Sequence, residues 1–167
     1  MRILSTCLLA LSLGLPALSY GADAGKPLFA SKVVTEGMVD IDIDITGVNE
    51  LWLVVTDGGN GFGADWADWV DPVLVGANGE TKLGELKAKS ATTGWGTLGI
   101  NKNAGGADMK IGGKPVTGFG VHAPSMMVYD IEGKGFTRFK AKGGIDNGGS
   151  DQNGGSSVQF LVFAPKP

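Results

Sequence analysis

The sequence has a single cysteine, Cys7, and a single histidine, His122. Because Cys7 lies inside an apolar N-terminal stretch, we expect the mature chain to have no disulfide and no thiol chemistry. A lone histidine cannot form a zinc site without partners, and no serine stands in a nucleophile-elbow context. These shortages remove thiol, zinc and serine-hydrolase chemistry from the candidate functions.

Basic clusters and helix signals are also scarce. The chain has 14 basic and 17 acidic residues and a formal net charge of −3, with no basic stripe, so we expect no nucleic-acid partner. After residue 24 no segment has apolar residues at a sustained helical spacing. These absences favour an all-β domain with a mildly acidic surface.

Residues 1–24 have the layout of a secretory signal peptide. Arg2 precedes an apolar stretch over residues 3–18, and small residues follow it, which places the cut after Gly21 or Ala24. The stretch is too short to span a membrane. We therefore expect a secreted, periplasmic or cell-envelope product with no membrane span, and a single domain over residues 25–167.

Strand signals recur through the rest of the chain. Residues 39–45, VDIDIDI, alternate apolar and acidic side chains, which predicts a strand with one buried face and one solvated face rather than a metal site. Residues 50–57, ELWLVVTD, are apolar enough to be covered on both faces, with Trp52 in the core. Asn78-Gly79 and Gly112-Gly113 are strong hairpin turns. About ten short strands with glycine-rich turns predict an antiparallel β-sandwich or jelly roll.

Residues 56–69, TDGGNGFGADWADW, are the densest functional candidate. A dinucleotide loop is disfavoured, because the glycine spacing is wrong and Pro72 follows before a helix could form. A calcium loop fits better, since acidic and amide side chains offer oxygen ligands, although the spacing matches no helix-loop-helix site. The oxygen ligands of this predicted site are Asp57, Asn60, Asp65 and Asp68. The alternative is a long connection whose two tryptophans plug the end of the sandwich.

A second candidate is the segment GFGVHAPS, residues 118–125. Side chains alternate across a strand, so Phe119, Val121 and Ala123 should face the core and His122 the opposite side of the sheet. A lone histidine is usually structural or merely exposed. The segment therefore needs a neighbouring site before a ligand role can be assigned to it.

Several segments resemble the NPCBM family, carbohydrate-binding modules found beside glycoside hydrolases. The resemblance is strongest over GFGVHAPSMMVYDIEGKGFTRFKAKGGIDNGG and the following SSVQFLVF. The stretch over residues 44–74 is also similar to the family, where it usually comes last, and residues 25–31 resemble the piece that ordinarily follows VQFLVF. This circularly permuted order predicts that the strand near residues 28–34 runs beside the strand at 157–163.

The resemblance implies a galactose-binding-like β-sandwich that binds sugars, including galactose-bearing glycans, sometimes with calcium. Sugar recognition needs polar partners for hydroxyl groups and an aromatic surface for the C–H face of the ring. The candidate ligand-binding residues are Trp66, Trp69, His122, Asp146 and Asn147. If a site exists, Trp66, His122 and Asp146 should share one rim.

Each of these assignments has a plainer alternative. The family often has histidine where this chain has Trp66, which leaves an inherited role for that position open. Asp146 could simply brace its own loop, as aspartate often does in turns. Trp95 lies between two glycines and could be an exposed sugar platform, although filling the space that they leave is the favoured interpretation.

The sequence therefore predicts a secreted, non-catalytic carbohydrate-binding module. Its partners would be a glycan or polysaccharide and proteins of the cell envelope, and it would require no cofactor beyond the calcium considered above. The alternative is a structural or protein-interaction sandwich without a sugar site, since a fold does not specify a function. A glycoside hydrolase is a third hypothesis, which no recognisable catalytic set supports.

Overall fold

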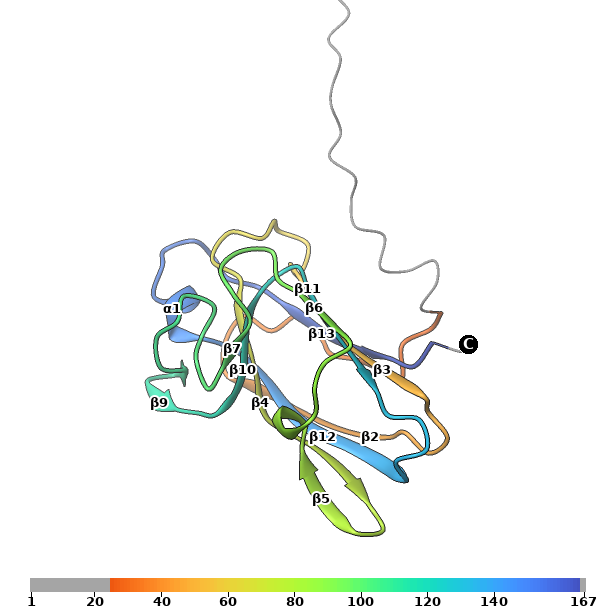
Figure 1. Cartoon of the computed structure of the whole chain (residues 1–167). Coiled ribbons are helices and arrows are strands. Elements are labelled where there is room, and N and C mark those ends of the chain that lie inside the picture. The colour runs from red at the N-terminus through yellow and green to blue at the C-terminus, as the bar shows by residue number, and fades with distance from the viewer. Residues whose placement is uncertain (1–24, 166–167) are drawn as a thin grey trace, which may run out of the picture.

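The computed structural model describes residues 25–165, so the predicted signal peptide over residues 1–24 lies outside the described residues. The described chain forms two antiparallel sheets packed as a sandwich (Figure 1), which confirms the predicted fold class. The order of the five-stranded sheet is β1 (Phe29–Ala30), β13 (Gln159–Phe163), β3 (Glu50–Thr56), β11 (Ser125–Asp130) and β6 (Ser90–Thr92). The order of the six-stranded sheet is β2 (Met38–Asp44), β12 (Phe136–Ile145), β4 (Trp66–Gly76), β10 (Gly118–His122) and β7 (Gly99–Ile100), with β5 (Gly79–Lys82) also paired to β4.

Shorter elements lie outside the two sheets. They are the two-stranded ribbon of β8 (Lys110–Ile111) and β9 (Lys114–Pro115), the 3-10 helix η1 (Leu83–Glu85) and the helix α1 (Asn147–Ser150). Both predicted hairpins are present. β8 pairs with β9 across Gly112-Gly113 as predicted, whereas the turn between β4 and β5 is Ala77-Asn78, one residue before the predicted Asn78-Gly79, because Gly79 pairs with Gly76. Gly112 and Gly113 have φ of 56° and 76°, the left-handed conformation that glycine adopts without a steric penalty.

The core lies between the sheets and contains the inward side chains of both. Ile41 and Ile45 of the alternating segment are buried, and the aspartates between these apolar residues lie on the outer face of the sheet. Asp42 pairs with Arg138 of β12, with 2.7 Å between the charged atoms. The predicted buried and solvated faces of this strand are therefore correct. The acidic side chains on the solvated face lie opposite basic side chains of β12.

The two ends of the described chain lie side by side. Phe29 of β1 is opposite Val162 of β13, and Val34 forms a bridge with Val158. This is the pairing that the permuted order requires, so the prediction that residues 28–34 run beside residues 157–163 is confirmed.

Trp52 corrects one prediction about the core. Leu51 and Leu53 point into the main core, whereas Trp52 lies half-buried on the outer face of the five-stranded sheet, beside Val54. Its Nε1 donates a hydrogen bond to Glu50 Oε1 over 2.5 Å. The strand is apolar on both faces, as expected, and the alternation places this tryptophan on the outer one.

Residues 25–165 include no helix that has both the length and the apolar character needed to cross a membrane.

Candidate functional site

Two neighbouring strands bring the predicted site residues to one end of the sandwich. Trp66 begins β4 and is directly opposite His122, the last residue of β10. Asp146 follows the last residue of β12, and its backbone N–H donates to the carbonyl of Trp66 over 3.0 Å. The structure therefore places Trp66, His122 and Asp146 on the same rim. In Figure 1 this rim is at the top, beside the yellow loop after β3, and the β4–β5 hairpin projects at the bottom, at the opposite end of β4.

Four aromatic side chains meet on this rim, and we call them the aromatic rim: Phe62, Trp66, Trp95 and His122. The Trp66 and Trp95 ring centroids are 5.3 Å apart, and those of Trp95 and His122 are 5.9 Å apart. Phe62 contacts His122 edge-on, with centroids 6.5 Å apart. Trp95 is 54% exposed and Phe62 is 61% exposed, so the cluster presents two open aromatic faces to solvent.

Trp95 overturns the favoured sequence interpretation. It does not fill the space that its glycine neighbours leave; it projects outward, because those glycines let the backbone pass close to the rest of the chain. A Cβ at Gly94 would lie 2.5 Å from the Ala123 carbonyl oxygen. Phe62 was missed altogether, although its glycine neighbours at 61 and 63 are the same signal of an aromatic side chain held on an open loop.

His122 is fixed in orientation by its own strand end. Its Nδ1 lies 2.6 Å from the Ala123 carbonyl oxygen, and because a carbonyl only accepts, Nδ1 carries the proton. Its backbone N–H donates to Thr93 Oγ1 over 2.9 Å. His122 is 5% exposed, so its ring lies under Trp95 and Phe62 and braces them. Phe119, Val121 and Ala123 face the core, which confirms the predicted alternation.

Trp69 is not part of a surface site. It is 0% exposed, and its ring packs between Phe139 and Phe160, with centroids 6.3 Å and 5.0 Å away. The predicted ligand role of Trp69 is therefore wrong, and the alternative interpretation as a core plug describes it. The strand period explains the difference, because Trp69 is an odd number of residues from Trp66 and must face the other side of the sheet.

Asp146 is a structural brace. It is 1% exposed, and its carboxylate accepts hydrogen bonds from Asn103 Nδ2, from the Lys110 backbone N–H and from the Gly148 backbone N–H, over 2.7–2.9 Å. Direct contact between Asp146 and a ligand is thus a wrong prediction. The amide of Asn147 is also used within the chain, since its Oδ1 accepts from the Gly113 backbone N–H over 2.9 Å. Its predicted sugar contact remains a prediction.

Asp68 is buried against Asp146 on the outer face of β4. It is 0% exposed, and neither carboxyl oxygen has a hydrogen-bond partner within residues 25–165. Its strand neighbours are Gly120 and Gly144, and a Cβ on Gly120 would lie 2.5 Å from the Cα of Asn103. The glycines thus let the loop after β7 close over the acid. Burial, and then the charge of Asp146, raise the pKa of Asp68 to about 9.

The predicted calcium ligands separate into two places. Asn60 Oδ1 accepts from Ser157 Oγ over 2.6 Å, and Asp65 Oδ1 accepts from the Ser157 backbone N–H over 2.8 Å. The backbone carbonyl of Asp57 also accepts from Ser157 Oγ, so these three residues surround one serine. Asp68 lies instead with Asp146, and no three acidic or histidine side chains gather as metal ligands in the described part of the chain. Asp57, Asn60, Asp65 and Asp68 therefore do not fit one calcium site, which needs six to eight oxygen ligands.

Comparison with known proteins identifies a family. No curated protein and no solved structure matches the chain at a significant level. A family model described as NPCBM/NEW2 domain matches residues 20–75 and 79–166, which together make up most of the sequence. The chain therefore belongs to the NPCBM/NEW2 domain family, a family of binding modules.

Proposed function

We propose that this domain is a secreted, non-catalytic carbohydrate-binding module and that its glycan contacts are made at the aromatic rim. The observation that carries the proposal is the exposure of Trp95, which is held in place by Trp66 and His122. An exposed aromatic ring that is braced from behind offers a rigid apolar face at little cost in side-chain entropy. The family match supports the same class of ligand.

The chemistry of the rim suits a pyranose ring. The C–H face of the sugar would lie on Trp95, and the buried ring of His122 would support Trp95 from behind. A galactose unit has an axial C4 hydroxyl, so one of its faces is a continuous apolar patch that can stack on an aromatic ring. We therefore propose galactose-containing glycans as the first ligands to test.

The acids of the rim support binding rather than hydrolysis. A glycosidase needs two carboxyl groups that can reach the scissile bond from opposite sides. Asp68 and Asp146 are the coupled carboxyl pair of this end of the sandwich, and both are almost completely buried. Since Asp146 also accepts three hydrogen bonds from protein donors, the pair is suited to hold loops together rather than to reach a substrate.

A glycan array tests the proposal. The wild-type domain should bind a subset of glycans, and Trp95→Ala should lose most of that binding while keeping its far-UV circular dichroism. Met38→Ala is the matched control, because Met38 is 49% exposed and lies on β2, outside the rim. Equal binding by the wild type and Trp95→Ala, or no binding by a folded wild type, would favour the protein-interaction sandwich instead.

Secretion is a separate part of the proposal. The layout of residues 1–24 supports export to the periplasm, the cell envelope or the medium, where glycans and envelope proteins are available as partners. Mass spectrometry of the protein recovered from a fractionated producing cell should give an N-terminus after Gly21 or Ala24. Recovery of the full-length chain in the cytoplasm would contradict export.

A further inference from the structure

The six-stranded sheet opens where β4 changes neighbours. β10 pairs with β4 only as far as Val70, and β5 begins to pair at Val73. The register of β4 against β12 shifts at the same place, between Lys140 and Lys142. Asp71 and Pro72 therefore form a bulge between two different partner strands. Bulges are common next to functional sites because they interrupt the ladder and redirect side chains.

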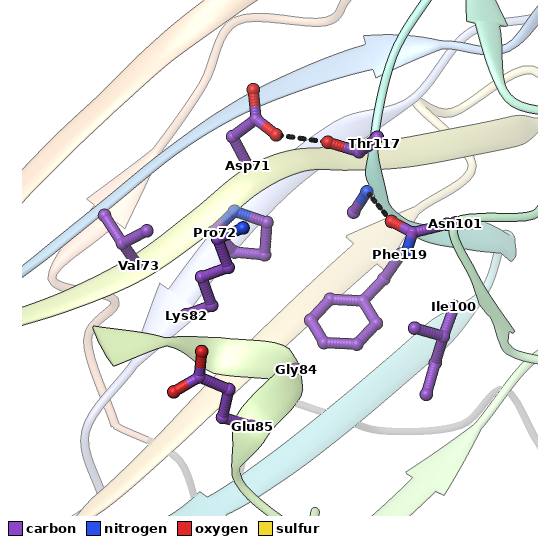
Figure 2. Close-up of a pocket in the computed structure, with 11 residues that line it drawn as sticks. Asp71, Pro72, Val73, Lys82, Gly84, Glu85, Ile100, Asn101, Thr117 and Phe119 are labelled. Carbon is purple, nitrogen blue, oxygen red and sulfur yellow. Dashed lines mark hydrogen bonds between the residues drawn. The ribbon is translucent and has the colours of Figure 1, made fainter. Parts of the chain in front are cut away.

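A cavity of about 370 Å³ lies over this bulge. Figure 2 shows the ring of Phe119 beside Ile100, with Pro72 and Lys82 across from them and Glu85 below Lys82 on the same side. Ile100 is 61% exposed at the edge of the sheet, so its side chain is accessible to a ligand. The volume lies within the range of small-molecule sites, which are apolar with a few polar groups.

Two polar side chains at the rim of the cavity are held in uncommon backbone conformations. Asp71 and Asn101 have φ of 45° and 54°, and they are two of the three non-glycine residues in residues 25–165 with positive φ. Thr117 Oγ1 donates to Asp71 Oδ1 over 2.5 Å, and Asn101 Oδ1 accepts from the Gly118 backbone N–H over 3.0 Å. Within the described residues, Asp71 Oδ2 and Asn101 Nδ2 make no further hydrogen bond. In Figure 2 the carboxylate of Asp71 points to Thr117 and away from the ring of Phe119, so the amide of Asn101 is the oriented polar group that remains open beside the cavity.

We propose that this cavity, which we call the bulge pocket, is a second binding site for a neutral sugar ring. The apolar floor of Phe119, Pro72 and Ile100 would take the C–H face of a pyranose. The carboxylate of Glu85 accepts a hydrogen bond from a hydroxyl group, and the amide of Asn101 donates one. The two carboxylates of Asp71 and Glu85 against the single cation of Lys82 disfavour an anionic ligand, so the pocket selects an uncharged polyol.

The position of the bulge pocket adds a function to the module. Phe119 and His122 are three residues apart on the same strand, so their side chains face opposite sides of the sheet, and the bulge pocket and the aromatic rim lie on different faces. A module with both sites would therefore bind two glycan chains instead of one. The inference shares its ligand class with the proposed function, although it rests on a different set of residues.

NMR titration of the ¹⁵N-labelled domain separates the two sites. The probes are the methyl glycosides of galactose, glucose, mannose and N-acetylglucosamine, added well above millimolar concentration. We expect at least one of them to shift the amides of residues 99–101 and 117–119, separately from those of Thr93 and His122. Shifts at the rim alone would overturn the bulge pocket and leave the proposed function standing; shifts at the pocket alone would do the reverse, and shifts at neither would overturn both.

Asn101→Gly tests the assignment because glycine keeps the positive φ and removes only the side chain. It should weaken the titration of the pocket amides at least tenfold and leave the rim amides as in the wild type. Asn78→Gly, in the exposed β4–β5 turn, is the matched control and should change neither. Wild-type affinity at the pocket amides in Asn101→Gly would show that the shifts do not report the proposed contacts.

Discussion

Trp95 stacks on Trp66 with ring centroids 5.3 Å apart and an interplanar angle of 33°. The two tryptophans differ in what lies behind them. Trp95 faces solvent, whereas the backbones of two loops pack onto the ring of Trp66, where a Cβ at Gly148 would lie 2.5 Å from a ring carbon. Trp66 therefore has a supporting role in the aromatic rim, and Trp95 is the tryptophan that exposes its ring to a ligand.

This difference predicts that alanine substitutions of the two tryptophans have different effects: one lowers both stability and glycan binding, and the other lowers glycan binding alone. Trp66→Ala should lower the free energy of unfolding by about 2 kcal/mol, because it leaves a gap under the loops, and it should also weaken glycan binding. Trp95→Ala should weaken binding by tenfold or more with a change in stability of less than about 0.5 kcal/mol, as is usual for exposed positions. Urea unfolding and glycan titration of both variants check this. Equal stability of the two variants would refute the supporting role of Trp66.

The brace at Asp146 gives a second prediction. Asp146→Asn keeps one acceptor oxygen and places an amide N–H₂ against protein donors, so one of the three hydrogen bonds must be lost. We expect a loss of about 1–3 kcal/mol in the free energy of unfolding at pH 7. Asp151→Asn, an exposed acid in the same loop, should cost far less. An equal loss in both variants would mean that loop charge, rather than the brace, sets the stability.

The raised pKa of Asp68 predicts how the free energy of unfolding depends on pH. Its folded pKa is about 9 and its ordinary value is 3.8, so between these values the folded chain holds a proton that the unfolded chain has released. The free energy of unfolding should therefore fall by about 1.4 kcal/mol for each pH unit as the pH rises through this window. Burial also raises the pKa of Asp65 to about 6, which adds the same sign of effect between roughly pH 4 and pH 6.

Asp68→Asn separates the contribution of Asp68 from that of Asp65. The variant cannot ionise at position 68, so its unfolding free energy should change little between pH 6 and pH 9, and it should gain on the wild type as the pH rises. Urea unfolding at pH 5, 7 and 8.5 measures both profiles. Parallel profiles for the two proteins above pH 6 would contradict the raised pKa of Asp68.

The close approach of the Asn103 loop to Gly120 predicts that a side chain at position 120 would move this loop away from Asp68. In Gly120→Ala the new Cβ would lie 2.5 Å from Asn103 Cα, so the loop must move, and overpacking of this kind costs about 1–3 kcal/mol. Movement of Asn103 would admit water to Asp68 and reduce the pH dependence described above. Gly63→Ala is the control, because a Cβ there meets no atom within 4 Å. A wild-type pH profile in Gly120→Ala would show that the loop does not seal the carboxyl group.

Local patterns predicted the parts of the fold that local rules determine. The alternation over residues 39–45 gave the faces of β2, and Asn78-Gly79 gave the β4–β5 turn to within one residue, because strand period and turn conformation are properties of neighbouring residues. The resemblance supplied the long-range pairing of β1 with β13, which no local pattern contains.

The site was harder to predict because its properties depend on residues far apart in the sequence. Asp68 and Asp146 are both acids in glycine-rich segments, and their burial follows from a loop around Asn103 that no spacing rule connects to them. Trp95 shows the opposite case, in which flanking glycines expose a ring. Alternation alone could have removed Trp69, since Trp66 and Trp69 cannot face the same side of one strand.

The pairing of β1 with β13 allows the proposed permutation to be reversed in the laboratory. A chain that starts at Gly79, runs to Pro165, crosses a short Gly/Ser linker to Gly25 and ends at Gly76 has its new termini in the exposed β4–β5 turn. It follows the segment order that the resemblance implies for the family, and it keeps every strand. Because closing a short loop changes the chain entropy only slightly, its free energy of unfolding should lie within about 1–2 kcal/mol of the natural chain.

Amide NMR fingerprints and urea unfolding compare this permutant with one cut between Phe139 and Lys140, inside β12. That second cut breaks a strand whose side chain at Phe139 is 0% exposed, so it should prevent folding. The Gly79 permutant should reproduce the natural fingerprint away from the new ends and should keep the glycan response of Trp95. A Gly79 permutant that stays unfolded with linkers of several lengths would show that the β4–β5 connection, rather than the packing of the two sheets, determines the fold.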